Sequence, residues 1–329
     1  MILRRLRAPL GVTESVEGML TTSPLKLWTV ASDINFREFF EQARRSLGDD
    51  LGTFLERWTF ALIKPDGIAA RKIDDFVRVL SSAGFLPMFA TTLRLDRLMM
   101  RELWRYEMNL ASMQRMDAID LLLTSCDSLL IMLKDECPSE RSACRRLGAF
   151  KGPSQAPLRE PHHLRSLVGA GNGIFNHVHS SDEPVDMVRE IGVLLEPHVR
   201  QELLDAVSVS GAPADISEVR DRLYAATPAH ALDVEASLAR LRDSVARLPA
   251  GPARFALEKF CLIARGGSCD WFTAYRIASD IGIDVERWDW ITLAAHCSIF
   301  DVPGVPKFHK ALREVLTSDE VKHSEASYA

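Results

Sequence analysis

The spacing of apolar residues predicts strands alternating with helices in the first part of the chain. The run "WTFALI" at 58–63 is apolar apart from one threonine and stops at Lys64-Pro65-Asp66-Gly67, which predicts a buried strand ending in a turn. Helical spacing over 69–84 predicts a helix that ends at Gly84. The same criteria predict further strands at 85–95, 127–133 and 173–175, and helices at 97–123, 139–148 and 184–195.

This order of elements predicts an α+β fold, a ferredoxin-like antiparallel sheet covered by helices. Pro87 favours an edge position or a bulge in its strand, because proline has no amide hydrogen to donate to a neighbouring strand. We expect three parts: a leader at 1–56 with one amphipathic helix at 36–47, the α+β domain at 57–197, and a third domain at 198–329.

The third domain is predicted to be all-α. From about residue 199 the strand signals vanish, and helical periodicity marks 231–248, 253–265, 271–282 and 287–297. Its tryptophans, Trp271, Trp288 and Trp290, either pin the helical core or present a surface to a partner, and their exposure separates these alternatives. The last dozen residues are polar, and we expect them to fray.

Composition narrows the class of protein. Hydrophobic residues make up 47% of the 329 residues and charged residues 26%, which is typical of a soluble globular protein. A net charge of −5 gives no basic surface for nucleic acid, and no apolar run is long enough to span a membrane. Six scattered cysteines without a Cys-x-x-Cys pair argue against structural zinc and favour reduced thiols in the cytoplasm. The N-terminus lacks the uninterrupted apolar segment of a secretory signal.

Polar side chains crowd into residues 176–182, "NHVHSSD", directly after a short apolar run. The two histidines, His177 and His179, fit metal ligation, a histidine nucleophile or a plain polar turn. A zinc site needs a third ligand, and His162 and His163 lie in a proline-rich loop that gives no reason for them to converge. We therefore expect no metal held by the protein alone, and we expect His177 to point away from His179 at this turn.

Three stretches together resemble signatures of one enzyme family. "TFALIKPDG" (59–67), "TSCDSLLIML" (124–133) and "NHVHSSDEP" (176–184) resemble, in that order, three motifs of the nucleoside diphosphate kinases. The resemblance covers about 58–195 and leaves the leader and the helical domain outside. It implies the ferredoxin-like fold and a kinase that moves the γ-phosphate of ATP or another nucleoside triphosphate, through a phosphohistidine, to a nucleoside diphosphate or an unusual acceptor.

The resemblance also implies a cofactor and an assembly. Mg²⁺ would come with the nucleotide and bridge its phosphates, rather than occupy a cage of protein ligands. The acceptor would be a nucleotide, another small molecule or a protein. Members of the family assemble as hexamers or tetramers, and the long flanking segments here leave open whether this chain forms a homo-oligomer.

The resemblance assigns the catalytic centre to one histidine and its support. His179 matches the histidine that accepts the phosphate, and Glu190, eleven residues further on, would hold its ring in one tautomer. Ser181 matches the serine that hydrogen-bonds this carboxylate, and Asp182 belongs to the same motif.

Other matched positions would bind the nucleotide. Lys64 and Arg165 match cations that neutralise a transferring phosphoryl group, and Lys64 is also counted as catalytic. Asn176 matches the amide that contacts the sugar and phosphate, and Trp104 falls where the family has a tyrosine that helps position the histidine. Taken singly, His179 could be a core residue, Lys64 a solvated turn residue and Arg165 a surface charge; their joint occurrence favours a site.

The sequence departs from the family at the phosphate clamp and at the base. Cys144 occupies the position of an arginine that clamps the phosphates, and Arg145 beside it would need to reach the nucleotide instead. Phe150 replaces a threonine, with Lys151 adjacent as a substitute cation. Residues 109–117 contain no aromatic ring to stack on a base, and such a contact is worth roughly 1–3 kcal/mol. These changes predict a divergent kinase with an altered base preference, or alternatively a weak or inactive nucleotide-binding module whose helical domain is a regulatory or partner-binding output.

Overall fold

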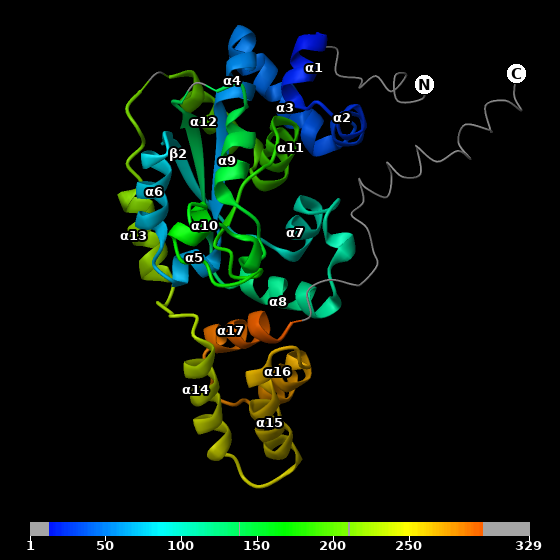
Figure 1. The fold of residues 1–329 in the computed structure, drawn as a ribbon, viewed down its shortest axis with the longest axis vertical. Coiled ribbons are helices and arrows are strands. Elements are labelled where there is room, and N and C mark those ends of the chain that lie inside the picture. Colours follow the sequence, from blue (N-terminus) through cyan, green and yellow to red (C-terminus); the bar gives the residue numbers. More distant parts are fainter. Residues whose placement is uncertain (1–12, 138, 210, 299–329) are drawn as a thin grey trace, which may run out of the picture.

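The computed structural model describes residues 13–137, 139–209 and 211–298. Figure 1 shows a sheet wrapped by helices, with a helical bundle below it. The helices are α1 (Glu14–Leu20), α2 (Pro24–Ala31), α3 (Ile34–Leu47), α4 (Leu51–Arg57), α5 (Pro65–Ala69), α6 (Ile73–Ser82), α7 (Arg97–Leu103), α8 (Met113–Leu123), α9 (Ala143–Lys151), α10 (Leu164–Leu167), α11 (Pro184–Leu194), α12 (Pro197–Ser208), α13 (Ser217–Ala226), α14 (Val234–Ala246), α15 (Pro252–Ile263), α16 (Trp271–Asp280) and α17 (Arg287–Cys297).

The sheet confirms the ferredoxin-like prediction. Its strands, β1 (Trp58–Ile63), β2 (Phe85–Leu93), β3 (Ser128–Asp135) and β4 (Val178–His179), lie in the order β2-β3-β1-β4, and each neighbouring pair is antiparallel. β2 is an edge strand, and its register shifts between Pro87 and Phe89, so both features that the proline predicted are present.

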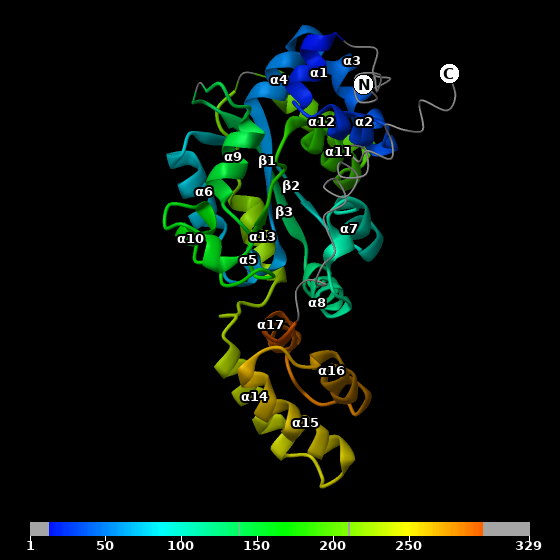
Figure 2. The ribbon, with the colours of Figure 1, turned by 45° about the vertical axis from the view of Figure 1, so that its right-hand side comes forward.

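Alternation along β1 divides the core between the two faces of the sheet. Phe60 and Leu62 join a core that includes α3 and α11, whereas Ala61 and Ile63 join one that includes α6, α9 and α10. Figure 2 shows α6, α9 and α10 on one side of the strands and α11 on the other. Because both faces are covered, all six residues of β1 are buried.

The predicted strand at 173–175 is wrong, since β4 begins at Val178. The side-chain oxygen of Asn172 accepts hydrogen bonds from the backbone amides of Ile174 (2.9 Å) and Phe175 (2.8 Å). These amides are therefore not available to a neighbouring strand, and the apolar run folds as a tight turn.

The described part of the predicted leader, residues 13–56, packs into the main hydrophobic core. Helices α1 to α4 bury their apolar faces in the same core as α11. Helices α3 and α11 approach so closely that a Cβ on Gly192 would lie 2.1 Å from the carbonyl oxygen of Asn35. Asp33, which caps α3, accepts a buried hydrogen bond from Arg189 Nε at 2.7 Å. Residues 1–12 of this predicted segment lie outside the described residues.

The helical bundle begins later than the predicted boundary at residue 198. Helix α12 packs on α3 and β2, and α13 packs on α5 and β2, so both belong to the sheet domain. The hydroxyl of Tyr224 on α13 accepts a hydrogen bond from the amide of Ile73 at 2.9 Å. The bundle proper consists of α14–α17. The predicted frayed tail lies outside the described residues.

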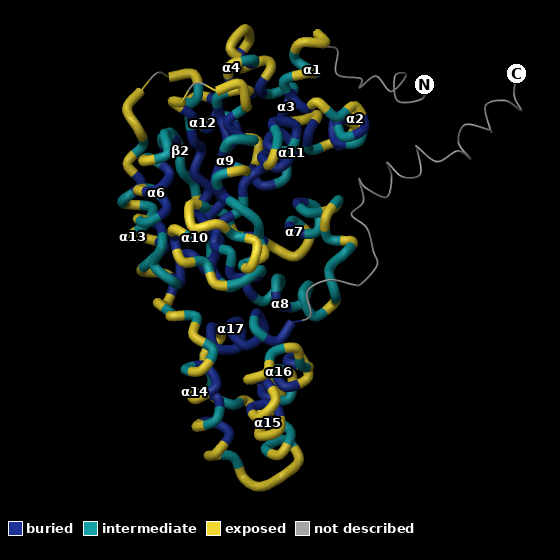
Figure 3. The backbone as a smooth tube through the Cα atoms, in the orientation of Figure 1, coloured by how far each residue is buried: buried dark blue, intermediate teal, exposed yellow. Residues whose placement is uncertain are grey.

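The three tryptophans of the bundle form core, not surface. Trp271 is fully buried, and Trp288 and Trp290 are 5% and 4% exposed. Helix α17, which carries two of them, is buried on nearly all sides because it lies between α8 and the other bundle helices (Figure 3). Arg287 at its start donates hydrogen bonds to the carbonyl of Leu121 and the hydroxyl of Thr124. Among the described residues, no helix is long and apolar enough to cross a membrane.

Candidate active site

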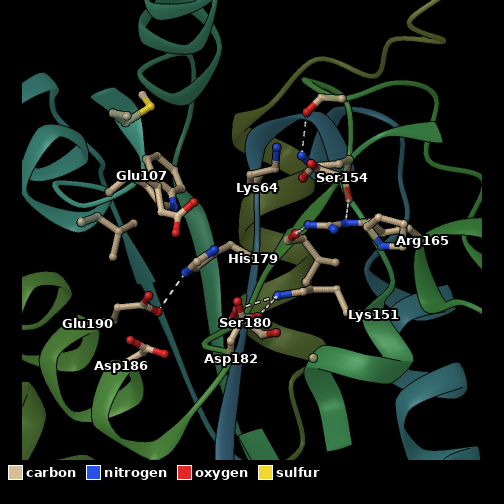
Figure 4. Close-up of a pocket in the computed structure, with 18 of the residues that line it drawn as sticks. Lys64, Glu107, Lys151, Ser154, Arg165, His179, Ser180, Asp182, Asp186 and Glu190 are labelled. Carbon is tan, nitrogen blue, oxygen red and sulfur yellow. Dashed lines mark hydrogen bonds and ion pairs between the residues drawn. The ribbon is translucent and has the colours of Figure 1, made fainter. Parts of the chain in front are cut away.

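A cavity of about 750 Å³ opens beside the ends of β1 and β4. Its walls come from the segment after β1, residues 103–110, α8, the end of α9, residues 152–176, β4 and the residues after it, and α11, with one residue from α2. Of the residues predicted to form the site, those that line it are Lys64, Trp104, Lys151, Arg165, Asn176, His179, Asp182 and Glu190. Figure 4 shows His179 at the centre of this arrangement, with Glu190 on one side and the cations on the other.

His179 is held from behind by an acidic side chain. Its register partner on β1 is Leu62, and its Nε2 lies 2.9 Å from Oε2 of Glu190 on α11. The Ser181 hydroxyl donates to the same oxygen at 2.6 Å, which is the contact expected of that serine. Burial alone would raise the pKa of Glu190, but His179 and the hydrogen bond from Ser181 bring this pKa below its ordinary value.

These contacts determine the tautomer of the imidazole. Since a carboxylate only accepts, Nε2 of His179 carries the proton and Nδ1 carries the lone pair. No hydrogen bond from a described residue reaches Nδ1. The indole of Trp104 meets the ring edge-on at 5.6 Å between centroids and restricts its rotation. His179 therefore lines the cavity with one ring nitrogen bound to Glu190 and the other carrying a lone pair.

His177 points away from the cavity and has a structural role. It adopts a left-handed conformation (φ 62°), and both its amide (2.9 Å) and its Nδ1 (3.0 Å) lie against Oδ2 of Asp66. Although burial opposes it, Lys64 and the hydrogen bonds from His177 lower the pKa of Asp66 to about 2. A Cβ on Gly67 would lie 3.0 Å from Ile63 and 3.3 Å from the His177 carbonyl, so this turn favours glycine.

Lys64 follows β1 directly and is 6% exposed. Its ammonium donates to the carbonyl of Ile174 at 2.8 Å and lies 3.7 Å from Asp66. Burial lowers the pKa of Lys64 to about 8, and Arg165 acts in the same direction against the opposing pull of Asp66. This lysine is therefore a cation with few partners, placed in the cavity wall.

Lys151 and Arg165 also line the cavity while they hold the main chain. Lys151 donates to the carbonyl of Ser180 at 2.8 Å and lies 3.2 Å from Asp182, and burial lowers its pKa. Arg165 donates to the carbonyls of Gly152, Val178 and Asn176 at 2.6, 2.8 and 3.3 Å. Burial lowers the pKa of Arg165 to about 10. Asn176 itself donates from its amide to the carbonyl of Gly173 at 2.8 Å.

Arg145 does not reach the cavity, contrary to the prediction. Its guanidinium donates to Glu183 at 2.6 Å and to the Thr22 hydroxyl at 3.3 Å, and it is not among the lining residues. The neighbouring Cys144 points into the core instead, with its sulfur 3.6 Å from the carbonyl of Trp58. One residue along a helix turns a side chain by about 100°, so Arg145 cannot replace an arginine at position 144.

Sequence reasoning missed part of the cavity wall. Lys26 on α2 and Asp186 on α11 line the cavity and form an ion pair of 2.5 Å. No motif marks Lys26, and only the packing of α2 onto α11 brings it to the site. The segment 103–123 supplies the aliphatic side chains of Met108, Leu110, Ile119, Leu122 and Leu123 to the wall, together with the rings of Trp104 and Tyr106.

The chain was compared with known proteins. No curated protein sequence matches it. Among solved structures, nucleoside diphosphate kinase from Aquifex aeolicus is 16% identical with a TM-score of 0.36, over 43% of this chain and 96% of that one. The enzyme from Halobacterium salinarum in complex with CDP is 19% identical with a TM-score of 0.37, over 50% and 98%. The enzyme from Encephalitozoon cuniculi is 17% identical with a TM-score of 0.34, over 42% and 87%.

The family assignment rests on the sequence match. The sequence model of the nucleoside diphosphate kinase family matches residues 57–199, which contain the whole sheet and every predicted site residue. The α2 and α17 contacts described above lie outside this range. Residues 57–199 are therefore a divergent domain of the nucleoside diphosphate kinase family.

Proposed function

We propose that this protein is a phosphotransferase that moves the γ-phosphate of a nucleoside triphosphate, through phospho-His179, to a nucleoside diphosphate or a related acceptor. The observation that carries the proposal is the orientation of His179, whose Nε2 is bound to Glu190 while Nδ1 is left without a protein partner among the described residues in a cavity lined by cations. We place this activity in the cytoplasm, since all six cysteines are free thiols.

The proposed reaction has two displacements. The Nδ1 lone pair of His179 attacks the γ-phosphorus; the N–P bond forms as the bond to the bridging oxygen breaks, and the nucleoside diphosphate leaves. The proton stays on Nε2, so the phosphorylated ring is cationic, and the Glu190 carboxylate at 2.9 Å stabilises it. A terminal phosphate oxygen of the acceptor then attacks phosphorus, and the N–P bond breaks.

The cavity cations keep donors for phosphate in spite of their main-chain contacts. An ammonium has three N–H groups; Lys64 uses one on Ile174, and Lys151 uses two, on Ser180 and Asp182. A guanidinium has five, and Arg165 uses three. Each side chain therefore retains at least one N–H for a phosphate oxygen, which supports charge stabilisation by positioned donors.

The donor set of the cavity fits Mg²⁺ that arrives with the nucleotide. The Asp182 carboxylate lines the cavity with a side chain that is 77% exposed, and oxygen is the ligand that Mg²⁺ prefers. In the described part of the chain, the one trio of residues close enough to hold an ion is His230, Glu286 and Asp289, and none of these lines the cavity. Bound Mg²⁺ would supply positive charge to the polyphosphate, with Asp182 as its protein ligand, directly or through water.

Labelling with γ-labelled ATP tests the proposal. We expect an acid-labile, base-stable label on the wild-type protein and none on His179→Ala. His162→Ala is the matched control, because this histidine is exposed in the neighbouring loop, does not line the cavity and should leave the label unchanged. A label that survives in His179→Ala would overturn the assignment.

A nucleotide-binding module without turnover is the second candidate. The observation that favours it is the loss of a clamping arginine, since Arg145 is bound to Glu183 and Thr22. In that case the α14–α17 bundle, docked on α8 through Arg287, would be the responding element. Tight binding of ATP by the wild-type protein with no phosphoenzyme would favour this function over the first.

A further inference from the structure

Acidic side chains gather at the start of α11. Asp182 and Glu183 precede the helix, and Asp186 and Glu190 follow on its first turns; of these four carboxylates, Glu190 contacts His179 directly. Asp186 and Glu190 are four residues apart, so they lie on one face of the helix and both line the cavity. Such a cluster repels phosphate and adds negative charge around the imidazole unless cations compensate it.

Lys26 supplies this compensation from outside the matched domain. Its ammonium lies 2.5 Å from Oδ2 of Asp186 and 2.8 Å from Oε2 of Glu183. The hydroxyl of Thr21, just before α2, donates to Glu183 at 2.9 Å and holds the two helices together. Burial raises the pKa of Asp186 to about 7 and Glu190 adds to the rise, while the Lys26 ammonium opposes it and favours the ionised carboxylate.

We propose that Lys26 is a positioning residue of the phosphotransfer site, which compensates the charge of Asp186 so that this carboxylate does not add to the effect of Glu190 on the basicity of His179. This inference rests on the proposed function of the cavity. Without Lys26, Glu183 and the ionised fraction of Asp186 would lose the cation that they share, and this negative charge would stabilise the imidazolium form of His179. Below the midpoint of the His179 titration, less of the neutral nucleophile would then be present. The segment 13–57 then contributes a side chain to the site in addition to its packing on α11.

Several elements bring charge to His179 and must be considered with Lys26. Helix α11 and the residues before it bring acids and Arg189, the segment after α7 brings Glu107, and α2, α8, α9, α10 and the residue after β1 bring cations. The charged groups that line the cavity or pair with its acids are Glu107, Asp182, Glu183, Asp186, Glu190, Lys26, Lys64, Arg115, Arg145, Lys151, Arg165 and Arg189. Of these, Lys26 is the one paired with Asp186.

The test compares single and double variants of Lys26 and Asp186 by titration of the His179 ring. NMR of the C2 proton, assigned with His179→Gln, gives the midpoint in the full-length protein. We expect Lys26→Met to raise the midpoint by about 0.5–1 pH unit, since neighbouring negative charge favours the protonated ring. Asp186→Asn should lower it, Lys26→Met/Asp186→Asn should return it close to wild type, and Lys26→Arg should leave it unchanged.

The same variants predict an effect on phosphorylation. Below the midpoint, the rate of phosphoenzyme formation should fall about 3–10-fold in Lys26→Met and recover at higher pH, because each pH unit changes the neutral fraction tenfold. Lys72→Met is the matched control, since Lys72 pairs with Asp75 at the start of α6, away from the cavity. Circular dichroism confirms that each variant is folded, and Lys26→Arg and Asp186→Asn keep the test decisive where Lys26→Met is not.

Failure of this inference differs from failure of the proposed function. If the wild-type protein forms no phosphoenzyme, the function is wrong, and the NMR midpoints still decide the role of Lys26. If the wild-type protein is phosphorylated but Lys26→Met and Asp186→Asn leave the midpoint where it is, Lys26 has no electrostatic role, and the inference is overturned.

Discussion

Replacing Gly192 by alanine tests whether the N-terminal helices are an integral part of the sheet domain. A Cβ at this position would lie 2.1 Å from the carbonyl oxygen of Asn35 and 2.8 Å from its carbonyl carbon. Both are backbone atoms at the start of α3, so no side-chain rotation relieves the clash, and α3 has to move away from α11. Overpacking a core costs typically 1–3 kcal/mol, and the rigidity of the obstacle places this substitution at about 2–3 kcal/mol.

Urea denaturation measures this cost. With a dependence of free energy on urea of about 2–3 kcal/mol per molar, the midpoint should fall by roughly 1 M. Limited proteolysis should also cut the segment 13–57 sooner in Gly192→Ala than in wild type, because the α3–α11 contact is the one that opens.

The same substitution elsewhere provides the control. Gly18 lies within α1, and a Cβ there would have no atom within 4 Å. Gly18→Ala should therefore leave stability unchanged or raise it by about 0.4–1 kcal/mol, since alanine restricts the unfolded chain. If Gly192→Ala keeps the midpoint and the proteolytic pattern of the wild type, the close packing of α3 on α11 is refuted.

Three further predictions concern the cavity. Glu190→Gln should slow phosphoenzyme formation about 100-fold in single-turnover labelling, because a neutral amide neither fixes the tautomer of the histidine nor balances the phosphorylated ring; an unchanged rate would contradict this. Since the pKa of Lys64 is about 8, affinity for a non-hydrolysable ATP analogue should fall as pH rises through that value and the ammonium is lost, and calorimetry on Lys64→Arg should show no such fall. Gly152→Ala should lower the free energy of unfolding by about 1–3 kcal/mol, as φ is +76° and the new Cβ would lie 2.4 Å from His163; a stability equal to wild type would be the contrary result.

The strands and helices of the sheet domain were predictable because local patterns decide them. The apolar run at 58–63 forms β1 with the same limits, and the position of Pro87 in an edge strand follows from the missing amide. The prediction of a strand at 173–175 failed because the apolar residues do not reveal the effect of Asn172. The side-chain oxygen of Asn172 accepts hydrogen bonds from the backbone amides of Ile174 and Phe175. A competing side-chain acceptor leaves no trace in hydrophobic periodicity.

The domain boundaries were less predictable, since they depend on contacts between distant segments. Nothing in the sequence of α3 shows that its partner is α11, and only the close approach at Gly192 reveals it. Similarly, α12 and α13 have the same periodicity as the bundle helices but pack on the sheet domain. Amphipathic patterns show that a helix buries one face, but they do not identify what covers that face.

The same distinction between local patterns and distant contacts applies to the residues of the site. The His179–Glu190–Ser181 contacts were predictable, because motif spacing places His179 on β4, Ser181 in the short segment after it and Glu190 on the following helix, α11. Arg145 was predicted from its place beside a lost arginine, and the structure turns it towards Glu183 because one helical step changes direction by about 100°. No motif could predict the role of Lys26, since this residue lies on α2, outside the matched residues 57–199.

Both walls of the cavity are fastened by segments outside the matched residues 57–199. On one side, Lys26 binds Asp186 on the first turn of α11 and Thr21 binds Glu183 just before it, and Glu190 lies one turn further along the same helix. On the other side, α8 lines the cavity, and Arg287 at the start of α17 donates to the carbonyl of Leu121 in that helix, while the Ser298 hydroxyl donates to the carbonyl of Gln114. His179 sits on a two-residue strand, so its position depends on these walls as well as on the sheet. The flanking helices α2 and α17 therefore contribute to the shape and the charge of the cavity, in addition to the residues of the family motifs.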